Sequence, residues 1–285
     1  MRFSLAIALA LFASDIRADP ARLEFSSRFV AGDWSDEYGG LSGIHVHPGG
    51  TRATLVGDRG RLFDVGLTRR SDGTLASDVL LNIKILHLYD PAVPIDTEGL
   101  VVSDTGDVFI STEGPPLILH YDAARSWPTV LAAPPELPVP RSNRGFEALA
   151  QDSTGGLITL PEVPQGPNGF PLLRLKDGVW DTIAHLPHIR DYQVVGADVD
   201  HQNRLYILER AVSLLGFRSQ IRRLDLNDLD QPAEVLWTST IVSYDNLEGL
   251  SLWRDETGQT RVVLVSDNNF FKIQRSEFVE LILIE

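Results

Sequence analysis

Short apolar runs, separated by polar turns, recur along the chain at intervals of about fifty residues. Each copy opens with an apolar run beginning at a small residue, passes through a polar turn and returns in a second apolar run. Short runs with β-branched residues and turn signals between them are typical of β-strands. Intervals of 56, 49, 49 and 52 residues separate the middle residues of the five opening segments, which are Ser42-Gly43-Ile44, Glu98-Gly99-Leu100, Glu147-Ala148-Leu149, Gly196-Ala197-Asp198 and Glu248-Gly249-Leu250.

This interval matches the length of a four-stranded β-propeller blade. Every copy contains a polar turn, such as "DSTGG" or "DETGQT", whose Gly, Asn and Asp residues suit hairpin geometry. No segment after the N-terminal region shows a sustained helical period, which argues against βαβ architecture. The sequence therefore predicts an all-β fold, a β-propeller with five visible repeats. A sixth blade stays open as an alternative, because the first interval is longer.

The two ends of the chain complement each other. The fifth copy has only two further apolar runs after its opening segment, "VVLVSD" and "EFVELILIE", and so lacks an outermost strand. The N-terminal run "RLEFSSRFV" belongs to no copy. We expect this run to pair with the last blade, because the pairing closes the ring and removes an exposed sheet edge.

Composition narrows the class of protein. The 285 residues are 43% hydrophobic and include 23 Gly and 17 Pro, which is typical of a globular, turn-rich domain. The formal net charge of −14 argues against a nucleic-acid partner and favours cations as ligands. The chain has no cysteine, which excludes disulfides, thiolate metal sites and cysteine nucleophiles.

The first residues have the pattern of a secretory signal. Arg2 supplies the positive start, Phe3 to Ala13 is an apolar run, and Ile16-Arg17-Ala18 offers a cleavage site. We therefore expect a signal peptide over 1–18, a propeller domain over 19–285 and a periplasmic or secreted protein. The alternative is a buried N-terminal helix. No later run is long and apolar enough to span a membrane.

Acidic residues recur at the same places in the repeats. In a propeller the first strand of each blade lines the central channel, and the second runs antiparallel to it. The start of the first strand and the end of the second therefore lie at one face. Glu98, Glu147 and Glu248 begin three opening segments, and Asp198 lies nearby in the fourth copy. All five second runs carry an acid at their end, at Asp58, Glu113, Glu162, Glu209 and Asp267.

The expected ring of carboxylates around one mouth predicts a bound cation. Close carboxylates repel one another, and a divalent cation neutralises them directly. Oxygen ligands without sulfur favour a hard ion, Ca²⁺ or Mg²⁺. The alternative is structural, in which the acids accept backbone N–H bonds or join blades. The predicted metal ligands are Asp58, Glu98, Glu113, Glu147, Glu209, Glu248 and Asp267, with neutral oxygens nearby from Asn143, Asn246, Asn268 and Asn269.

Three arginines, Arg59, Arg144 and Arg210, interleave with these acids. Arginine pairs with carboxylates or holds an anionic group such as phosphate. Acids, cation and arginine together would suit hydrolysis of a phosphate or carboxylate ester by metal-activated water. The predicted catalytic residues are Glu147, Arg144 and Arg59. Two other candidates carry less weight: a histidine pair, His45 and His47, on one face of a strand, and Ser42, which lacks the surrounding pattern of a nucleophile elbow.

The ordered segments "GGLSGI", "VGDRGRL", "DTEGL", "STEG", "NRGFEALA", "YILER", "NLEGLSL", "VSDNNF" and "QRSEFVEL" resemble the bacterial family called "esterase-like activity of phytase". The resemblance extends from about Tyr38 to Leu283. It implies an exported propeller related in fold to the calcium-dependent propeller phytases. The chain departs from the family at Ala148, in place of glycine, and at "VVGADVD", which lacks the glutamate. These departures leave Glu98, Glu147, Glu248 and Asp267 as the best supported ligands.

The expected function is thus an exported phytase-like hydrolase of small anionic or ester substrates, with Ca²⁺ or another hard divalent cation at the acidic mouth. In this mechanism the cation activates water, and Arg144 or Arg59 holds the anion. Two alternatives remain from the sequence. One is a non-catalytic propeller that binds a ligand or a protein partner at the same mouth, and the other is a lactonase of the sugar-lactone type. Fold alone does not choose among them.

Overall fold

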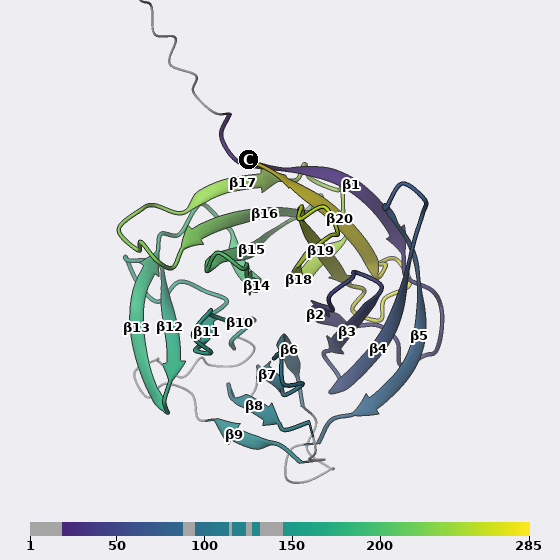
Figure 1. Cartoon of the computed structure of the whole chain (residues 1–285), viewed down its shortest axis with the longest axis horizontal. Coiled ribbons are helices and arrows are strands. Elements are labelled where there is room, and N and C mark those ends of the chain that lie inside the picture. Colours follow the sequence, from purple (N-terminus) through teal and green to yellow (C-terminus); the bar gives the residue numbers. More distant parts are fainter. Residues whose placement is uncertain (1–18, 88–94, 114–115, 124–126, 132–144) are drawn as a thin grey trace, which may run out of the picture.

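A computed structural model of the chain describes residues 19–87, 95–113, 116–123, 127–131 and 145–285. The predicted signal peptide over 1–18 lies outside the described residues. The described residues form five four-stranded antiparallel sheets arranged around a central axis (Figure 1). No helix among them is long and apolar enough to cross a membrane.

Each sheet is one blade, and in the first four blades the strands follow one another outward from the axis in chain order; in the fifth, β1 lies outermost. The innermost strands are β2 (Leu41–Val46), β6 (Thr97–Val102), β10 (Ala148–Gln151), β14 (Gln193–Val199) and β18 (Asn246–Arg254). The second strands are β3 (Arg52–Gly57), β7 (Val108–Thr112), β11 (Leu157–Leu160), β15 (Arg204–Ser213) and β19 (Thr260–Asp267). The third strands are β4 (Arg61–Arg69), β8 (Ile118–Tyr121), β12 (Phe170–Lys176), β16 (Gly216–Asp225) and β20 (Glu277–Ile284). The outermost strands are β5 (Leu75–Ile85), β9 (Thr129–Leu131), β13 (Val179–Leu186), β17 (Glu234–Thr238) and β1 (Arg22–Val30).

The predicted propeller is confirmed with five blades in the described part of the chain. The N-terminal strand β1 pairs antiparallel with β20, so the fifth sheet has the order β1-β20-β19-β18. Residues from the two ends of the chain therefore share one sheet, and β20 gains a partner on its outer edge.

The turns between first and second strands repeat one local design. In the turn after β10, Asp152 Oδ1 accepts backbone N–H bonds from Thr154 and Gly156. In the turn after β18, Asp255 Oδ1 accepts the same bonds from Thr257 and Gln259. Gly155 and Gly258 both have φ of +82°, a conformation that favours glycine. The repeated Asp-x-Thr-Gly sequence thus fixes each hairpin locally.

Apolar side chains fill the space between neighbouring blades. One cluster joins Leu41 and Phe63 of the first blade to Val265 and Phe278 of the fifth, and all four are fully buried. Burial on both faces explains why the inner strands are nearly continuous apolar runs.

The innermost strands approach one another closely around the axis, and each contacts the next, with β18 contacting β2. Their glycines face backbone atoms of the neighbouring blade. A Cβ added at Gly43 would lie 2.6 Å from the Glu98 carbonyl oxygen, and one at Gly99 would lie 2.8 Å from that of Glu147. At Gly196 the distance to the Glu248 carbonyl oxygen would be 2.4 Å. The small residue of each repeat is therefore required where inner strands meet.

The substitution Gly99→Ala is expected to lower the free energy of unfolding by about 1–3 kcal/mol, because overpacking forces a backbone shift. The added Cβ would lie 2.7 Å from the backbone nitrogen of Leu149, an atom that belongs to the next blade. Gly66→Ala is the control, since the nearest atom there is a side-chain methyl of Val79 at 3.0 Å. Denaturant unfolding of both variants tests this packing; equal losses at the two sites would contradict it.

Candidate functional site

Four of the five first strands carry a β-bulge close to where they begin, β10 being regular. In β18 the register skips between Leu247 and Gly249, and in β6 it skips between Thr97 and Leu100. The bulged residues include Glu248 and Glu98. A bulge re-aims a side chain relative to the regular strand, and bulges are frequent beside active sites. Each glutamate is thus turned toward the mouth of the channel, which it lines.

Glu98, Glu147 and Glu248 come together at this mouth from three different blades, as the sequence predicts. Glu98 and Glu147 are only 8% and 7% exposed. Burial raises the pKa of Glu98 well above its usual range, and the carboxylates of Glu147 and Glu248 raise it further. Burial, followed by the charges of Glu248 and Glu162, likewise raises the pKa of Glu147. The three groups are near enough to oppose each other's ionisation.

Acids from the ends of the second strands line the same pocket, which has a volume of about 410 Å³. Asp96, two residues before Glu98, also lines it, although the sequence analysis did not select this residue. The sequence could have indicated it, because in "DTEGL" the residue two positions before Glu98 is also an acid. The full set is eight carboxylates, from Asp58, Asp96, Glu98, Glu113, Glu147, Glu162, Glu248 and Asp267.

The assignment of Glu209 to this ring is wrong. Gly196 pairs with Leu208, just as Gly249 pairs with Val265, so Glu209 corresponds in register to Ser266 and not to Asp267. A shift of one residue along a strand turns the side chain to the opposite face. Glu209 is fully buried and accepts hydrogen bonds from Arg222 and from Gln220, the latter at 2.6 Å. It joins two strands of the fourth blade and has no part in the mouth.

Arg210 occupies the place that an acid fills in the other four blades. Its guanidinium forms an ion pair with Glu248 and lies 3.7 Å from Glu162. It also donates to Asn246 Oδ1 at 2.7 Å, and Asn246 Nδ2 donates to Glu248 Oε1 at 2.8 Å. Arg210 is the one basic residue among the described residues that line the pocket. It therefore offsets a single charge and fixes the orientation of Glu248.

Arg59, another of the predicted arginines, does not line this pocket. Arg59 is exposed beside Asp58, and its guanidinium stacks 3.5 Å from the centre of the Phe270 ring. Arg144 lies outside the described residues, as does Asn143. Asn268 Oδ1 accepts backbone N–H bonds from Gly40 and Phe270, which ties it to the loop structure.

The outer carboxyls of the pocket have pKa values near neutrality. Burial, and then the charges of Asp267 and Asp96, raise the pKa of Asp58 to about 7. Burial and the neighbouring Asp96 raise the pKa of Glu113 to about 7. Burial likewise raises the pKa of Glu248 to about 7, with Arg210 opposing the shift. Such shifts are typical of sites whose charges are arranged for binding or catalysis.

The donor set fits a hard divalent cation. Ligand oxygens of Asp96, Glu98 and Glu113 lie within 4.8 Å of one another, and so do those of Glu113, Glu147 and Glu162. Glu113 belongs to both groups, so the two groups adjoin. Asp58 Oδ1 is buried and has no hydrogen-bond donor among the described residues. Carboxylate oxygens crowded without matching donors are the ligands that Ca²⁺ and Mg²⁺ take in proteins.

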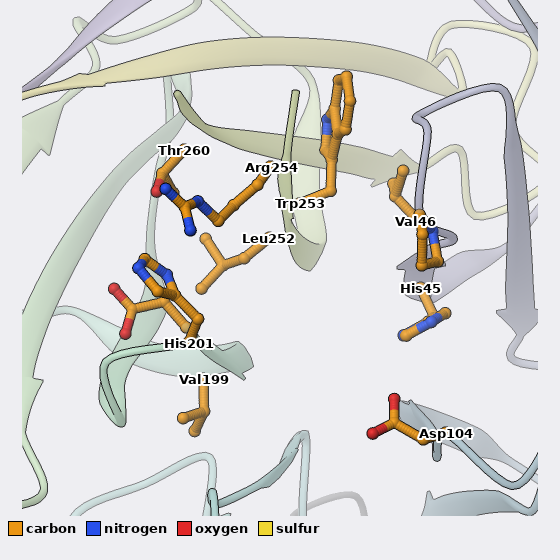
Figure 2. Close-up of a pocket in the computed structure, with 11 residues that line it drawn as sticks. His45, Val46, Asp104, Val199, His201, Leu252, Trp253, Arg254 and Thr260 are labelled. Atoms are coloured by element: carbon orange, nitrogen blue, oxygen red, sulfur yellow. The ribbon is translucent and has the colours of Figure 1, made fainter. Parts of the chain in front are cut away.

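A second pocket, of about 400 Å³, lies at the opposite ends of the first strands (Figure 2). Its walls include His45, His201, Trp253 and Arg254, and it contains none of the eight carboxylates. The rings of His45 and His47 meet edge to face with centroids 5.0 Å apart. Burial lowers the pKa of His45 to about 4, which keeps its imidazole neutral. The two histidines belong to this face and take no part in the acidic mouth.

Asp198 also lies away from the acidic pocket. Its carboxylate accepts the backbone N–H of Leu252 at 2.7 Å and that of Val199 at 2.8 Å. The residue that corresponds to the bulged glutamates is Val195, since the register of β14 skips between Val194 and Gly196. Asp198 therefore joins the fourth and fifth blades, which is the structural role that the sequence left open for such acids.

Comparisons with solved structures support the fold. The PQQ-bound aldose sugar dehydrogenase from Streptomyces coelicolor matches with a TM-score of 0.52 and 12% identity, over 93% of this chain and 99% of that chain. A gluconolactonase from Xanthomonas campestris matches with a TM-score of 0.50 and 12% identity, over the same shares of the two chains. At this identity the likeness shows the fold alone. A search of curated proteins gives no significant match.

A comparison with sequence profiles of protein families identifies one family. The profile is described as phytase-like, esterase-like activity of phytase, and it matches residues 36–270. This range includes all five inner strands and all eight carboxylates of the mouth. The chain belongs to the phytase-like family described as esterase-like activity of phytase.

Proposed function

We propose that the acidic mouth binds a divalent cation, with Ca²⁺ the best fit, and that the protein hydrolyses phosphate or carboxylate esters there. One observation carries the proposal: eight carboxylates from four blades line a single pocket with one arginine between them. Burying like charges together costs stability unless they are neutralised. A fold that keeps such a cluster is therefore built for a positively charged ligand.

The carboxylates of the two adjoining groups would hold the cation, with Glu113 shared between them. A bound divalent cation supplies Lewis-acid polarisation of a phosphoryl or carbonyl oxygen and lowers the pKa of bound water. A carboxyl whose pKa lies near 7 can also take a proton at neutral pH. Glu113 has such a pKa in the cation-free protein and lies beside Glu147. A cation bound by either carboxylate would lower its pKa, so the proton of an attacking water would go to whichever of the two does not ligate the cation.

The charged surroundings suggest how a substrate is oriented. Arg210 is already paired with Glu248, so its role is to hold that carboxylate in place. Arg59 is exposed at the edge of the mouth and is free to meet an anionic group of a substrate. Its stacking on Phe270 fixes the guanidinium plane, and φ values of +46° and +52° at Asn269 and Phe270 show that the supporting turn is strained.

A lactone is the second candidate substrate. The gluconolactonase from Xanthomonas campestris has the same fold across nearly its whole length. Opening a lactone and cleaving an ester both need an activated water and stabilisation of charge on a carbonyl oxygen. Activity measurements must therefore include lactones beside phosphate and carboxylate esters.

Purified protein with Ca²⁺ is expected to hydrolyse at least one substrate among p-nitrophenyl phosphate, p-nitrophenyl acetate, phytate and gluconolactone. Glu147→Gln is expected to reduce turnover by about ten- to a hundredfold, as loss of a metal-site group does elsewhere. Unchanged turnover in this variant would show that the acidic mouth takes no part in catalysis. Absence of turnover on the whole panel, together with Ca²⁺-dependent stabilisation, would instead indicate a binding propeller.

Glu147→Gln and Glu209→Gln are expected to act in opposite directions on stability. The first removes a carboxyl whose ionisation the cluster opposes, so the melting temperature of the cation-free protein rises at alkaline pH, where the unaltered carboxyl must ionise, while Ca²⁺ affinity falls. The second leaves Arg222 without its charged partner and lowers the free energy of unfolding by about 3–5 kcal/mol, with Ca²⁺ affinity unchanged. Calorimetric titration and thermal unfolding measure both effects; a loss of Ca²⁺ affinity in Glu209→Gln would contradict its position in the fold.

Ca²⁺-dependent stabilisation is expected to increase with pH. The pKa values of Glu113 and Glu248, about 7 in the folded protein, exceed the ordinary value of 4.5, so the cation-free fold holds protons that the unfolded chain has released. Its free energy of unfolding therefore falls as pH rises from about 5 to about 7. Ca²⁺ binds the deprotonated groups, so the rise in melting temperature on adding Ca²⁺ should be small near pH 5 and large near pH 8. Equal shifts at both pH values would contradict the assignment.

A further inference from the structure

Exposed apolar side chains gather in three loops of the fourth and fifth blades. The five most exposed large hydrophobic residues among the described residues are Leu214, Ile273, Leu215, Val242 and Phe271, with exposed fractions of 106%, 91%, 73%, 71% and 63%. Elsewhere in the described chain the most exposed such residue is Val179, at 59%. Single exposed apolar residues are ordinary on a protein surface, but a concentration of the most exposed ones marks an interaction site.

These five residues, here called the apolar rim, lie on loops that touch one another. Val242 donates its backbone N–H to the Phe217 carbonyl oxygen at 3.2 Å, which joins its loop to the hairpin carrying Leu214 and Leu215. On its other side, Asp245 Oδ2 accepts the backbone N–H of Arg275 at 2.8 Å, which joins it to the segment carrying Phe271 and Ile273. The three loops thus form one continuous surface.

The apolar rim borders the acidic mouth. Val212 and Phe217, on either side of the Leu214-Leu215 turn, both line the acidic pocket. Asn269, two residues before Phe271, lines it as well. Whatever covers the apolar rim therefore lies directly at the entrance to the candidate cation site.

The shape and sequence of the loops indicate insertion rather than a pocket. Leu214 and Leu215 are the two tip residues of the β15–β16 hairpin, where Gly, Asn and Asp are the usual choices. Side chains this exposed contribute little to the stability of the fold, and neither leucine lines the acidic pocket. Apolar side chains that project from neighbouring loop tips can insert into the boundary between the headgroups and the acyl chains of a lipid bilayer.

One exposed basic residue lies within the apolar rim. Lys272 lies between Phe271 and Ile273 and is exposed, whereas Arg275, whose side chain is 56% exposed, forms an ion pair with the buried carboxylate of Glu277 at 3.2 Å. Asp245 is half-buried, and its two oxygens accept backbone N–H bonds from Asn246 and Arg275. An exposed lysine within an apolar surface can meet the phosphate group of a lipid headgroup.

We propose that the apolar rim docks this protein on a phospholipid bilayer, so that the acidic mouth opens at the membrane surface. The leucines at the hairpin tip, with Phe271 and Ile273, enter the boundary between headgroups and acyl chains. Lys272 meets the phosphate groups. This inference goes beyond the proposed function and does not depend on it, because neither the cation nor hydrolysis is needed for docking.

Vesicle sedimentation tests the proposal, in buffer without divalent ions so that the outcome is separate from the cation site. Purified protein is expected to bind vesicles of phosphatidylcholine. The double variants Leu214→Ser with Leu215→Ser, and Phe271→Ser with Ile273→Ser, should each weaken binding by about tenfold or more, since each removes two large apolar side chains from the inserted surface. Melting temperatures of both variants should stay unchanged, because these side chains are exposed.

The matched control is Leu81→Ser with Val179→Ser, which removes two apolar side chains that are 55% and 59% exposed on outer strands away from the mouth. It should bind vesicles like the unaltered protein. Failure of the unaltered protein to bind these vesicles would overturn the proposal, and so would undiminished binding by either rim variant. Concentration-dependent dimers that the rim variants abolish, with no vesicle binding, would assign the apolar rim to a second copy of the chain and would also overturn it.

Discussion

The close approach of five inner strands around one axis is the constraint on which the rest of this structure depends. Gly43, Gly99 and Gly196 each face a backbone carbonyl oxygen of the next blade at a distance that leaves no room for a side chain. The carbonyl oxygens they meet belong to Glu98, Glu147 and Glu248. The packing that closes the ring thus also fixes the backbone of the three glutamates, so the architecture and the acidic site share the same atoms.

This sharing has an energetic consequence. Natural folds pair or solvate their charges, yet here eight carboxylates line one pocket with a single arginine, and burial raises the pKa of the innermost ones. The same chain pairs two other buried carboxylates with arginine: Glu209 is paired with Arg222, and Glu280 accepts hydrogen bonds from Arg69 and Arg261. Carboxylates are thus paired with arginine elsewhere in this protein but are crowded together at the mouth. Such local departures from charge pairing concentrate at functional sites.

The two ends of the channel differ in chemistry although the blades repeat. One end gathers carboxylates because a bulged residue and a strand-end residue both face it. The other end holds neutral His45 beside Trp253 and Arg254 (Figure 2). Around the acidic end the blades also differ from one another, since Arg210 replaces an acid and the hairpin of the fourth blade extends to Leu214 and Leu215. A repeated fold supplies a common frame, and the departures from the repeat give the site its charge and its surroundings.

The sequence by itself determined the propeller, its five repeats and the meeting of Glu98, Glu147 and Glu248, because a period of about fifty residues transfers directly into equivalent positions around an axis. It did not determine which strand-end acids face the mouth. Glu209 and Asp267 look alike in the sequence, yet they differ by one residue in register, and a single step along a strand reverses the side chain. Only the tertiary structure decided that register, because with equivalent bulges in β14 and β18 it is Arg210, and not Glu209, that occupies the register position of Asp267. Asp96 and Asp198 were likewise separated only by the structure: Asp96 lies just before β6 and lines the pocket, whereas Asp198 lies within β14 and bonds to the fifth blade.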